Sequence, residues 1–353
     1  MTRFAFVVHP IEPKDATRKY PVLRHLPDSL IEAFLSQKGP TFMSKATGIR
    51  SLTGAETEGW FIACPLTPKL MMQMPVEQVY DRIIECTEMA ADLGANLVGL
   101  GAFTSVIGDG GITINASSPI PVTTGNSYTV ATSIQGALRA CELLEIDPAV
   151  STLAVVGATG SIGKTCAKML APSFRHTVLI GRDLGRTQAV ALEIPGSEAT
   201  TSVDKLGEAD VIVTVTSSDS AVIEPEHLKI GAVVCDVARP RDVSLRVAAT
   251  RPDVLVIEGG VVAVPGDVEF GMNFGFPPKT AYACMSETMM LALENRPEAY
   301  TLGKNVTVAQ VQETIGWAEK HGFKLAGFRS FERAVTEETI ERVRQARRKP
   351  VAA

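Results

Sequence analysis

The sequence predicts an α/β fold with two domains, the second of which is built on a doubly wound parallel sheet. Beyond residue 151, short apolar runs rich in β-branched residues alternate with helical segments, which is typical of parallel strands connected by helices. The chain has 353 residues, of which 45% are hydrophobic and 21% charged. This length accommodates two hydrophobic cores, and the composition is that of an ordinary globular protein.

Residues 1–148 are predicted to form an N-terminal α/β domain. Its clearest helix covers 75–93, where apolar residues recur every three or four positions and Gly94 closes the helix. A second helix is predicted over 128–144. Residues 11–56 contain many prolines, and we expect irregular structure with a few helical turns there. Short apolar or β-branched runs predict strands over 4–8, 59–63, 96–100 and 113–115.

Residues 149–275 are predicted to form the domain with the parallel sheet. Its best defined helix covers 162–170, and another includes 189–193. Apolar runs predict strands over 153–156, 177–180, 211–215, 232–236 and 254–258. Residues 276–353 are predicted to be a helical segment that returns to the N-terminal domain, so that C-terminal helices pack back on the cleft. These helices are predicted over 281–293, 307–321 and 337–348.

The composition excludes several classes of protein. A net charge of −5 gives no general attraction to nucleic acid or to anionic lipid. No apolar stretch approaches the roughly 20 residues of a transmembrane helix, and the first residues lack the long apolar run of a signal peptide. Six cysteines and five histidines are scattered without the spacing of a disulfide framework or a metal site. We therefore expect a cytoplasmic protein without a metal.

A glycine-rich turn follows the strand predicted over 153–156. Residues 157–163 have the sequence GATGSIG, and a helix is predicted to begin within it. In dinucleotide-binding domains the first glycine permits a tight turn, the second lets the pyrophosphate approach, and the third lets helix and strand pack closely. The residues predicted to bind the cofactor here are Gly157, Ala158, Thr159, Gly160, Ser161, Ile162 and Gly163.

The end of the next strand indicates which dinucleotide is bound. Gly181 occupies the position where NAD-dependent enzymes usually carry an acidic residue, and Arg182 follows at once. Arg182 and Arg186 are suited to pair with a 2′-phosphate, so we favour NADP. A shifted register would instead place Asp183 beside the ribose. Later strand ends predicted to border the nicotinamide carry Thr214, Thr216, Gly259 and Gly260.

Cys284 is the candidate nucleophile. It lies in residues 271–290, where a loop rich in glycine and proline gives way to an apolar helix. Thr280 is predicted to be the N-cap, which places Cys284 in the first helical turn. Backbone N–H groups and the helix dipole favour a thiolate there. An activated thiol together with a nicotinamide site indicates reduction of an acyl group held on the enzyme as a thioester.

Five stretches of the chain resemble the long-chain acyl-[acyl-carrier-protein] reductases of cyanobacteria, in the same order. They are GLGAFTSV at 99–106, TTGN at 123–126, VVGATGSIG at 155–163, EGGVV at 258–262 and AYACMSE at 281–287. A more distant resemblance is to shikimate-dehydrogenase-like enzymes. The resemblance implies an N-terminal domain that binds the acyl substrate, a central NADPH-binding Rossmann domain and C-terminal helices that return to the cleft.

The resemblance also implies an activity: NADPH-dependent reduction of a fatty acyl thioester to a fatty aldehyde, through an acyl-enzyme on Cys284. An oxyanion forms when the thioester carbonyl is attacked. Candidates to stabilise it are the side chains of Asn126, Thr104 and Ser105 and backbone N–H groups near Gly101 or Gly259. The acyl donor is an acyl carrier protein or coenzyme A, and a possible partner is an enzyme that consumes the aldehyde.

Docking of an acidic carrier protein requires a basic surface. A run of basic residues at the C-terminus is the candidate, and it consists of Arg342, Arg344, Arg347, Arg348 and Lys349. Residues 11–58 match the reductases poorly and are candidates to shape the acyl pocket.

Two other functions are compatible with the sequence. A shikimate-type NADP-dependent alcohol or amino-acid dehydrogenase would have no covalent intermediate and would use a Lys–Asp pair in the first domain. Lys69 and Asp109 are the best candidates for that pair. A protein that senses the NADPH/NADP ratio would bind the cofactor without acyl transfer to Cys284.

Overall fold

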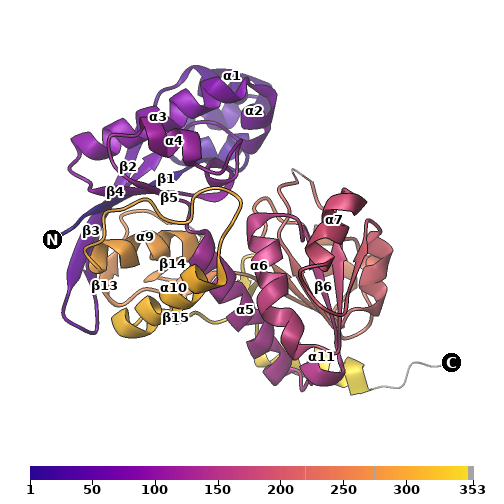
Figure 1. The fold of residues 1–353 in the computed structure, drawn as a ribbon. Coiled ribbons are helices and arrows are strands. Elements are labelled where there is room, and N and C mark those ends of the chain that lie inside the picture. The colour runs from indigo at the N-terminus through magenta and orange to yellow at the C-terminus, as the bar shows by residue number, and fades with distance from the viewer. Residues whose placement is uncertain (219, 274, 349–353) are drawn as a thin grey trace. The chain divides into compact units, whose positions relative to one another are not determined.

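The computed structural model describes residues 1–218, 220–273 and 275–348. Contacts within the chain divide it into two compact units (Figure 1). Unit 1 consists of Met1–Tyr128, Val262–Asn305 and Gln312–Lys324, and unit 2 consists of Thr129–Val261, Val306–Val311 and Leu325–Ala353. The division therefore falls inside helix α5 (Asn126–Leu143), whereas the sequence analysis placed a domain boundary at residue 148.

Unit 1 contains a mixed six-stranded sheet in the order β13-β2-β3-β1-β4-β5. Its central strands are parallel, and β2 runs antiparallel to β3. The strands are β1 (Phe4–Val8), β2 (Thr41–Arg50), β3 (Glu56–Ala63), β4 (Leu97–Leu100), β5 (Val122–Thr123) and β13 (Gly266–Glu269). In the register, Val8 lies opposite Ala63 and Val7 lies opposite Leu100. Residues that follow β1, β3 and β4 therefore gather at one edge of this sheet.

Helices pack on both faces of this sheet. Helix α3 buries Val79, Ile83 and Cys86 against one face, in the same core as Val98 and Leu100 of β4. Figure 1 shows α9 on the face opposite α3. The helices that lie wholly or mainly in unit 1 are α1 (Asp28–Gln37), α2 (Pro68–Gln73), α3 (Val76–Asp92), α4 (Ile112–Ser117), α9 (Ala283–Leu293) and α10 (Val308–His321).

Shorter elements complete unit 1. Three 3-10 helices are η1 (Pro13–Arg18), η2 (Pro21–His25) and η3 (Ala102–Ser105). Three short strands form a further sheet in the order β14-β12-β15, and they are β12 (Val261–Ala263), β14 (Thr280–Tyr282) and β15 (Lys324–Leu325).

Two predictions for this unit are wrong. The segment predicted as a strand at 113–115 lies in helix α4, because Gly111 begins the helix with a φ of 88° and the Asp109 carboxylate accepts hydrogen bonds from the Thr113 backbone. The segment predicted to be irregular, 11–56, contains helix α1 and the ten-residue strand β2.

Unit 2 contains a six-stranded parallel sheet in the order β11-β10-β9-β6-β7-β8. This confirms the predicted doubly wound sheet of Rossmann type. The strands are β6 (Thr152–Val156), β7 (His176–Ile180), β8 (Ser197–Thr200), β9 (Val211–Thr214), β10 (Val233–Asp236) and β11 (Leu255–Glu258). The helices that accompany α5 are α6 (Ser161–Leu170), α7 (Leu184–Ala191), α8 (Leu245–Thr250) and α11 (Glu337–Arg348).

Unit 2 also contains short elements at its strand ends. The 3-10 helices are η4 (Pro148–Val150), η5 (Ala171–Ser173), η6 (Val203–Glu208) and η7 (Pro225–His227). A two-stranded hairpin joins β16 (Arg329–Ser330) to β17 (Arg333–Ala334). Over the described residues, no helix combines the length and the apolarity that crossing a bilayer requires.

Candidate active site

Cys284 lies in the first turn of α9, as predicted, but the helix begins differently. Tyr282 is the N-cap, and α9 starts at Ala283. Thr280 belongs to strand β14, and its hydroxyl donates to the Pro277 carbonyl at 2.6 Å. The predicted N-cap is therefore wrong, because a short strand continues the loop to the start of the helix.

The backbone of another segment comes very close to Cys284. A Cβ added at Gly125 would lie 2.3 Å from both Cα and Cβ of Cys284, and Gly125 has a φ of 72°. Only glycine satisfies both conditions without strain. Backbone N–H groups of Met285 and Ala102 near the Cys284 sulfur act to lower the pKa of the thiol. The turn at 123–126 and the segment after β4 thus meet at the thiol.

The thiol is not activated in this structure. Burial raises the pKa of Cys284 to about 12, and the nearby carboxylate of Glu287 raises it further, whereas the Met285 and Ala102 N–H groups lower it. The expectation of a stabilised thiolate at the helix N-terminus is therefore wrong. The cost of burying a charge exceeds the stabilisation that backbone donors provide.

Glu287 is the most strongly bonded side chain near Cys284, and the sequence analysis did not single it out. It is fully buried. One carboxylate oxygen accepts from the hydroxyls of Thr123 (2.6 Å) and Thr301 (2.8 Å). The other accepts from the Ser127 hydroxyl (2.5 Å) and the Tyr128 N–H (3.0 Å). These bonds fix the segment that carries Gly125 against the helix that carries Cys284.

The signal for Glu287 was present in the sequence. It is a lone acidic residue within an apolar helix, three positions after Cys284. A charged residue is rarely buried unless it is paired or well hydrogen-bonded, so its position predicts a polar network around it.

The three side chains predicted to stabilise an oxyanion differ in whether their hydrogen-bond donors are already used. The hydroxyls of Thr104 and Ser105 donate to the carbonyls of Gly101 (2.8 Å) and Ala102 (2.7 Å), so both protons are used within η3. Asn126, which is almost fully buried, follows Gly125 directly and begins α5. Near the thiol the structure therefore places the Ala102 backbone N–H, and Asn126 directly follows the glycine that lies against Cys284.

His9 supports the turn beside the thiol. Its Nε2 accepts from the Phe103 N–H at 3.0 Å, so Nδ1 carries the proton and donates to the Pro10 carbonyl at 3.0 Å. Burial lowers the pKa of His9 to about 4. The ring is therefore neutral, and both nitrogens are occupied. Among the described residues, no group of three or more His, Cys, Asp and Glu is arranged to hold a metal.

The glycine turn in unit 2 has the geometry of a dinucleotide site. Gly157 has a φ of 80°, and a Cβ there would lie 2.5 Å from the Val215 carbonyl oxygen. A Cβ at Gly163 would lie 2.3 Å from the Gly157 oxygen, so α6 packs directly on the turn. The Ser161 hydroxyl, in the first residue of α6, is buried without a hydrogen-bond partner. A phosphate at this helix N-terminus would give it one.

The segment after β7 presents positive charge. Arg182 and Arg186 are exposed. The Asp183 carboxylate accepts from the Arg186 N–H at 2.8 Å and caps α7, so it is engaged away from a ribose. A Cβ at Gly181 would lie 2.3 Å from the Thr187 hydroxyl, which leaves no room for an acidic side chain. This segment therefore presents two exposed arginines and an aspartate that is engaged in capping α7.

The strand ends predicted to border the nicotinamide form a rigid edge. The Thr214 hydroxyl and the Thr216 N–H donate to the buried Asp242 carboxylate at 2.6 and 2.8 Å. Asp236 accepts from the Val243 N–H at 3.0 Å, and burial raises its pKa to about 6. The turn after β9 is thereby tied to the loop after β10.

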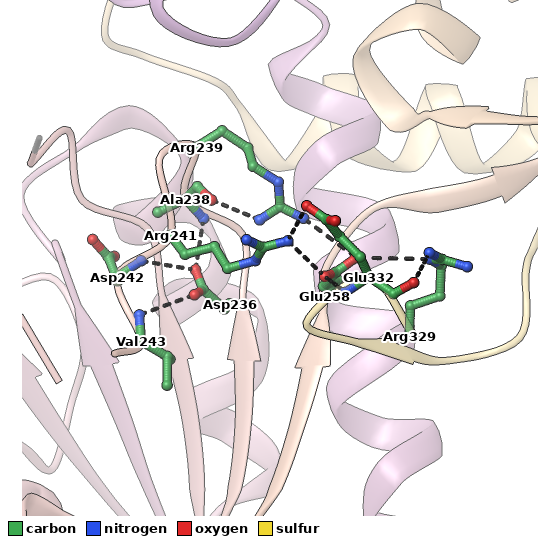
Figure 2. A network of polar contacts seen from close by, with 9 residues as sticks. All are labelled: Asp236, Ala238, Arg239, Arg241, Asp242, Val243, Glu258, Arg329 and Glu332. Atoms are coloured by element: carbon green, nitrogen blue, oxygen red, sulfur yellow. Dashed lines mark hydrogen bonds and ion pairs between the residues drawn. The ribbon is translucent and has the colours of Figure 1, made fainter. Parts of the chain in front are cut away.

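The end of β11 is held by ion pairs. Figure 2 shows three arginine side chains around the buried Glu258 carboxylate: Arg239, Arg241 and Arg329. The shortest pair joins Arg241 Nη2 to Glu258 Oε1 at 3.2 Å. The Glu332 N–H, in the hairpin between β16 and β17, donates to the same oxygen at 2.7 Å. These contacts fix the turn at Gly259 and Gly260, which follows Glu258 at once.

The residues of the alternative Lys–Asp pair are engaged elsewhere. Lys69 Nζ pairs with Glu32 at 3.0 Å. The Asp109 carboxylate accepts from the N–H and the hydroxyl of Thr113 at 3.0 and 2.6 Å. The structure therefore gives no support to a dyad of these two side chains.

Comparisons with known proteins agree with this geometry. The sequence profile of the family described as shikimate / quinate 5-dehydrogenase matches residues 142–257. These residues lie in unit 2 and include strands β6 to β10 and most of β11. The chain is 33% identical to "Aminotransferase PigE" of a Serratia species, over 78% of this chain and 33% of that protein. It is 27% identical to the long-chain acyl-[acyl-carrier-protein] reductase of Synechococcus elongatus, over 82% of this chain and 89% of that protein.

Among solved structures, the chain aligns with L-tryptophan dehydrogenase from Nostoc punctiforme. It aligns over 98% of this chain and 88% of its own, with 12% identity and a TM-score of 0.45. The present chain spans about a third of the length of the Serratia relative. The sequence matches and the parallel sheet support a Rossmann-type NAD(P)-dependent oxidoreductase.

Proposed function

We propose that this protein reduces a fatty acyl thioester, carried by an acyl carrier protein or by coenzyme A, to a fatty aldehyde. The observation that carries the proposal is the position of Cys284 in the first turn of α9, with its backbone against Gly125. The similarity of the chain to an acyl-[acyl-carrier-protein] reductase supports it.

In the proposed reaction, the Cys284 sulfur attacks the thioester carbonyl carbon. A new C–S bond forms, the bond to the carrier sulfur breaks, and the carrier thiol leaves with the proton that Cys284 gives up. The Ala102 N–H and the Asn126 amide are the donors for the transient oxyanion. Because the thiol is protonated in the free enzyme, its deprotonation must accompany substrate binding or attack.

NADPH, when bound, supplies the two electrons that convert the acyl group to the aldehyde and release the Cys284 thiol. The residues proposed to hold it are the glycine turn with Ser161 for the pyrophosphate and Arg182 with Arg186 for the 2′-phosphate. Thr214, Thr216, Gly259 and Gly260 border the nicotinamide in this proposal. The hydrogen bonds of Asp242 and the ion pairs of Glu258 hold these strand ends in place.

An aldehyde reacts readily with amines, so the product is expected to pass to an enzyme that consumes it. A relative named an aminotransferase, of which this chain covers one third, is consistent with such a step. We propose that the aldehyde-consuming partner acts on the free carbonyl after its release from Cys284.

The test is to incubate the protein with palmitoyl-coenzyme A or palmitoyl-[acyl carrier protein] and NADPH, and to identify the product by mass spectrometry. Palmitaldehyde is expected from the wild type and from Cys141→Ala, which removes a different, buried cysteine, but not from Cys284→Ala. Aldehyde from Cys284→Ala, or none from the wild type with either donor, would refute the proposal.

A shikimate-type dehydrogenase is the second candidate, favoured by the match of that family's profile to residues 142–257. It predicts NADP-dependent oxidation of a hydroxy acid or an amino acid that is unaffected by Cys284→Ala.

A further inference from the structure

A patch on unit 1 combines exposed apolar side chains with cations that form no ion pair within the part of the chain that the structure describes. It surrounds Tyr20, and we define the Tyr20 patch as Leu30, Phe34, Phe42, Lys19, Arg24 and Lys38. It lies within residues 11–58, the segment that matches the reductases poorly. Helix α1, which contributes Leu30 and Phe34, lies at the periphery of unit 1 (Figure 1).

Several members of the patch contact Tyr20 or one another. The ring of Tyr20 contacts that of Phe34 edge-on, with centroids 5.4 Å apart, and Lys38 Nζ lies 5.7 Å from the Tyr20 ring centre. The Tyr20 hydroxyl is 3.2 Å from that of Thr41. Lys19 Nζ donates to the Phe42 carbonyl at 3.2 Å. Residues from η1, η2, α1 and β2 thus meet around one tyrosine.

The apolar side chains of the patch are unusually accessible. Leu30 is 53% exposed, Phe34 37% and Phe42 43%. Leu30 and Phe34 are four residues apart on α1 and share a face. A neighbouring face of the helix, about 100° away, is already buried through Ile31 and Leu35. Exposed apolar surface of this kind, with a polar rim, is typical of an interaction site.

The charges favour an acidic partner. Within the described residues, Lys19, Arg24 and Lys38 form no ion pair; their bonded contacts are to carbonyl oxygens and to the Tyr20 ring. The basic C-terminal helix differs. Four of its arginines are engaged in unit 2: Arg342 with Glu338, Arg344 with Glu341 and the Leu143 carbonyl, Arg347 with Asp210, and Arg348 with Glu145. Lys349, predicted with them, lies outside the described residues.

The position of the patch relative to Cys284 follows from the strand register. Thr41, at the start of β2, lies opposite Ala63 at the end of β3. Ala63 in turn lies opposite Val8 of β1, and β1 neighbours β4, whose end leads to Ala102. The patch and the thiol are therefore at the same edge of one sheet. Three strand spacings, about 14 Å, separate β2 from β4.

We infer that the Tyr20 patch is the docking surface for an acidic acyl carrier protein. This inference rests on the proposed function. A carrier protein delivers its thioester on a long flexible arm, so it must dock at a distance from the nucleophile and on the same side. Its acidic surface complements the three unpaired cations, and an apolar residue on its docking helix fits between Leu30, Phe34 and Phe42.

The test compares two acyl donors that share one chain, palmitoyl-[acyl carrier protein] and palmitoyl-coenzyme A. In the double variant Lys19→Glu, Arg24→Glu, two attractions to the acidic carrier protein are replaced by repulsions. Because each such interaction at an exposed site is weak, the KM for the carrier-bound substrate is expected to rise by only about tenfold. The kcat, and both constants for the coenzyme A substrate, stay unchanged. The matched control reverses two exposed, paired arginines, Arg342→Glu and Arg348→Glu, and should behave as the wild type.

Equal effects on both donors, or no effect on either, would overturn the inference. If the wild type reduces neither donor, the proposed function fails, and calorimetric titration with the carrier protein then decides about the patch. If the double variant binds the carrier protein more weakly than the wild type and the control variant do, the result supports docking at the patch. Equal binding by all three proteins overturns it. Loss of binding to anionic phosphatidylglycerol vesicles with unchanged carrier binding would also overturn it and assign the patch to lipid.

Discussion

Gly125 and Cys284 are in direct backbone contact. A Cβ on Gly125 would lie 2.3 Å from the Cα and Cβ of Cys284, well inside van der Waals contact. The turn at 123–126 is held there by the bonds of Thr123 and Ser127 to Glu287. The surroundings of the thiol are therefore set by a glycine and a buried carboxylate that are distant in sequence from each other.

Replacing Gly125 by alanine should displace Cys284. The positive φ and the overlap together should lower the free energy of unfolding by about 3 kcal/mol and slow acylation of the thiol strongly. The control is Gly54→Ala, at a similar φ of 85° with nothing within 4 Å of the added Cβ; it should cost about 1 kcal/mol. Urea denaturation and acylation rates measure both effects. Equal behaviour of the two variants would show that the contact with Cys284 is unimportant.

Glu287→Gln should destabilise the protein. An amide accepts through one atom only, so donors now bonded to the second carboxylate oxygen lose their partner, at a cost of about 3 kcal/mol. The exposed Glu88 on α3 provides the control, because Glu88→Gln should change the free energy of unfolding by less than about 0.5 kcal/mol. A comparably small change for Glu287→Gln would mean that its hydrogen bonds do not stabilise the fold.

The reactivity of Cys284 should depend steeply on pH. Burial raises its pKa to about 12, and only the thiolate reacts with iodoacetamide, so the alkylation rate should rise about tenfold per pH unit between pH 7 and 10. Peptide mass spectrometry would assign the rate to Cys284. A plateau below pH 8 would instead show that the helix N-terminus stabilises the thiolate.

The raised pKa of Cys284 also makes the free energy of unfolding depend on pH. The folded-state pKa lies above that of the unfolded chain, so the thiol contributes stability at neutral pH that declines as the pH rises toward 12. Comparison of wild type with Cys284→Ala between pH 7 and 10 isolates this contribution.

Arg182 and Arg186 should select the phosphorylated cofactor. In Arg182→Ala, Arg186→Ala, the Kd for NADPH is expected to rise about thirtyfold, because two charge-assisted contacts to the 2′-phosphate are lost. The Kd for NADH, which lacks that phosphate, should change little. Fluorescence titration measures both, and an equal loss for the two cofactors would contradict a 2′-phosphate site.

Much of the fold could be predicted because buried parallel strands are continuous apolar runs. Strands β6, β7 and β9 to β11 were found for this reason. Strand β2 was missed because its sequence, TFMSKATGIR, mixes polar and apolar residues and its pairing with β3 contains irregularities. Helix α4 was missed because its start depends on the Asp109 side chain rather than on hydrophobic periodicity.

The site was predictable only where its chemistry is local. Cys284 and the glycine turn are recognisable from their neighbours in sequence. The pKa of Cys284 is not, because it depends on burial and on Glu287, which the local helix position does not determine. The sequence also does not predict that the Thr104 and Ser105 hydroxyls donate to the Gly101 and Ala102 carbonyls, because these bonds depend on the 3-10 turn that the chain forms there.

The central claim is that Cys284 carries the acyl group. The most direct measurement is intact-protein mass after mixing with palmitoyl-coenzyme A or palmitoyl-[acyl carrier protein] in the absence of NADPH. We predict a single palmitoyl adduct on the wild type, none on Cys284→Ala, and release of the adduct as aldehyde when NADPH is added. Equal labelling of both proteins, or an adduct that NADPH does not discharge, would contradict the account.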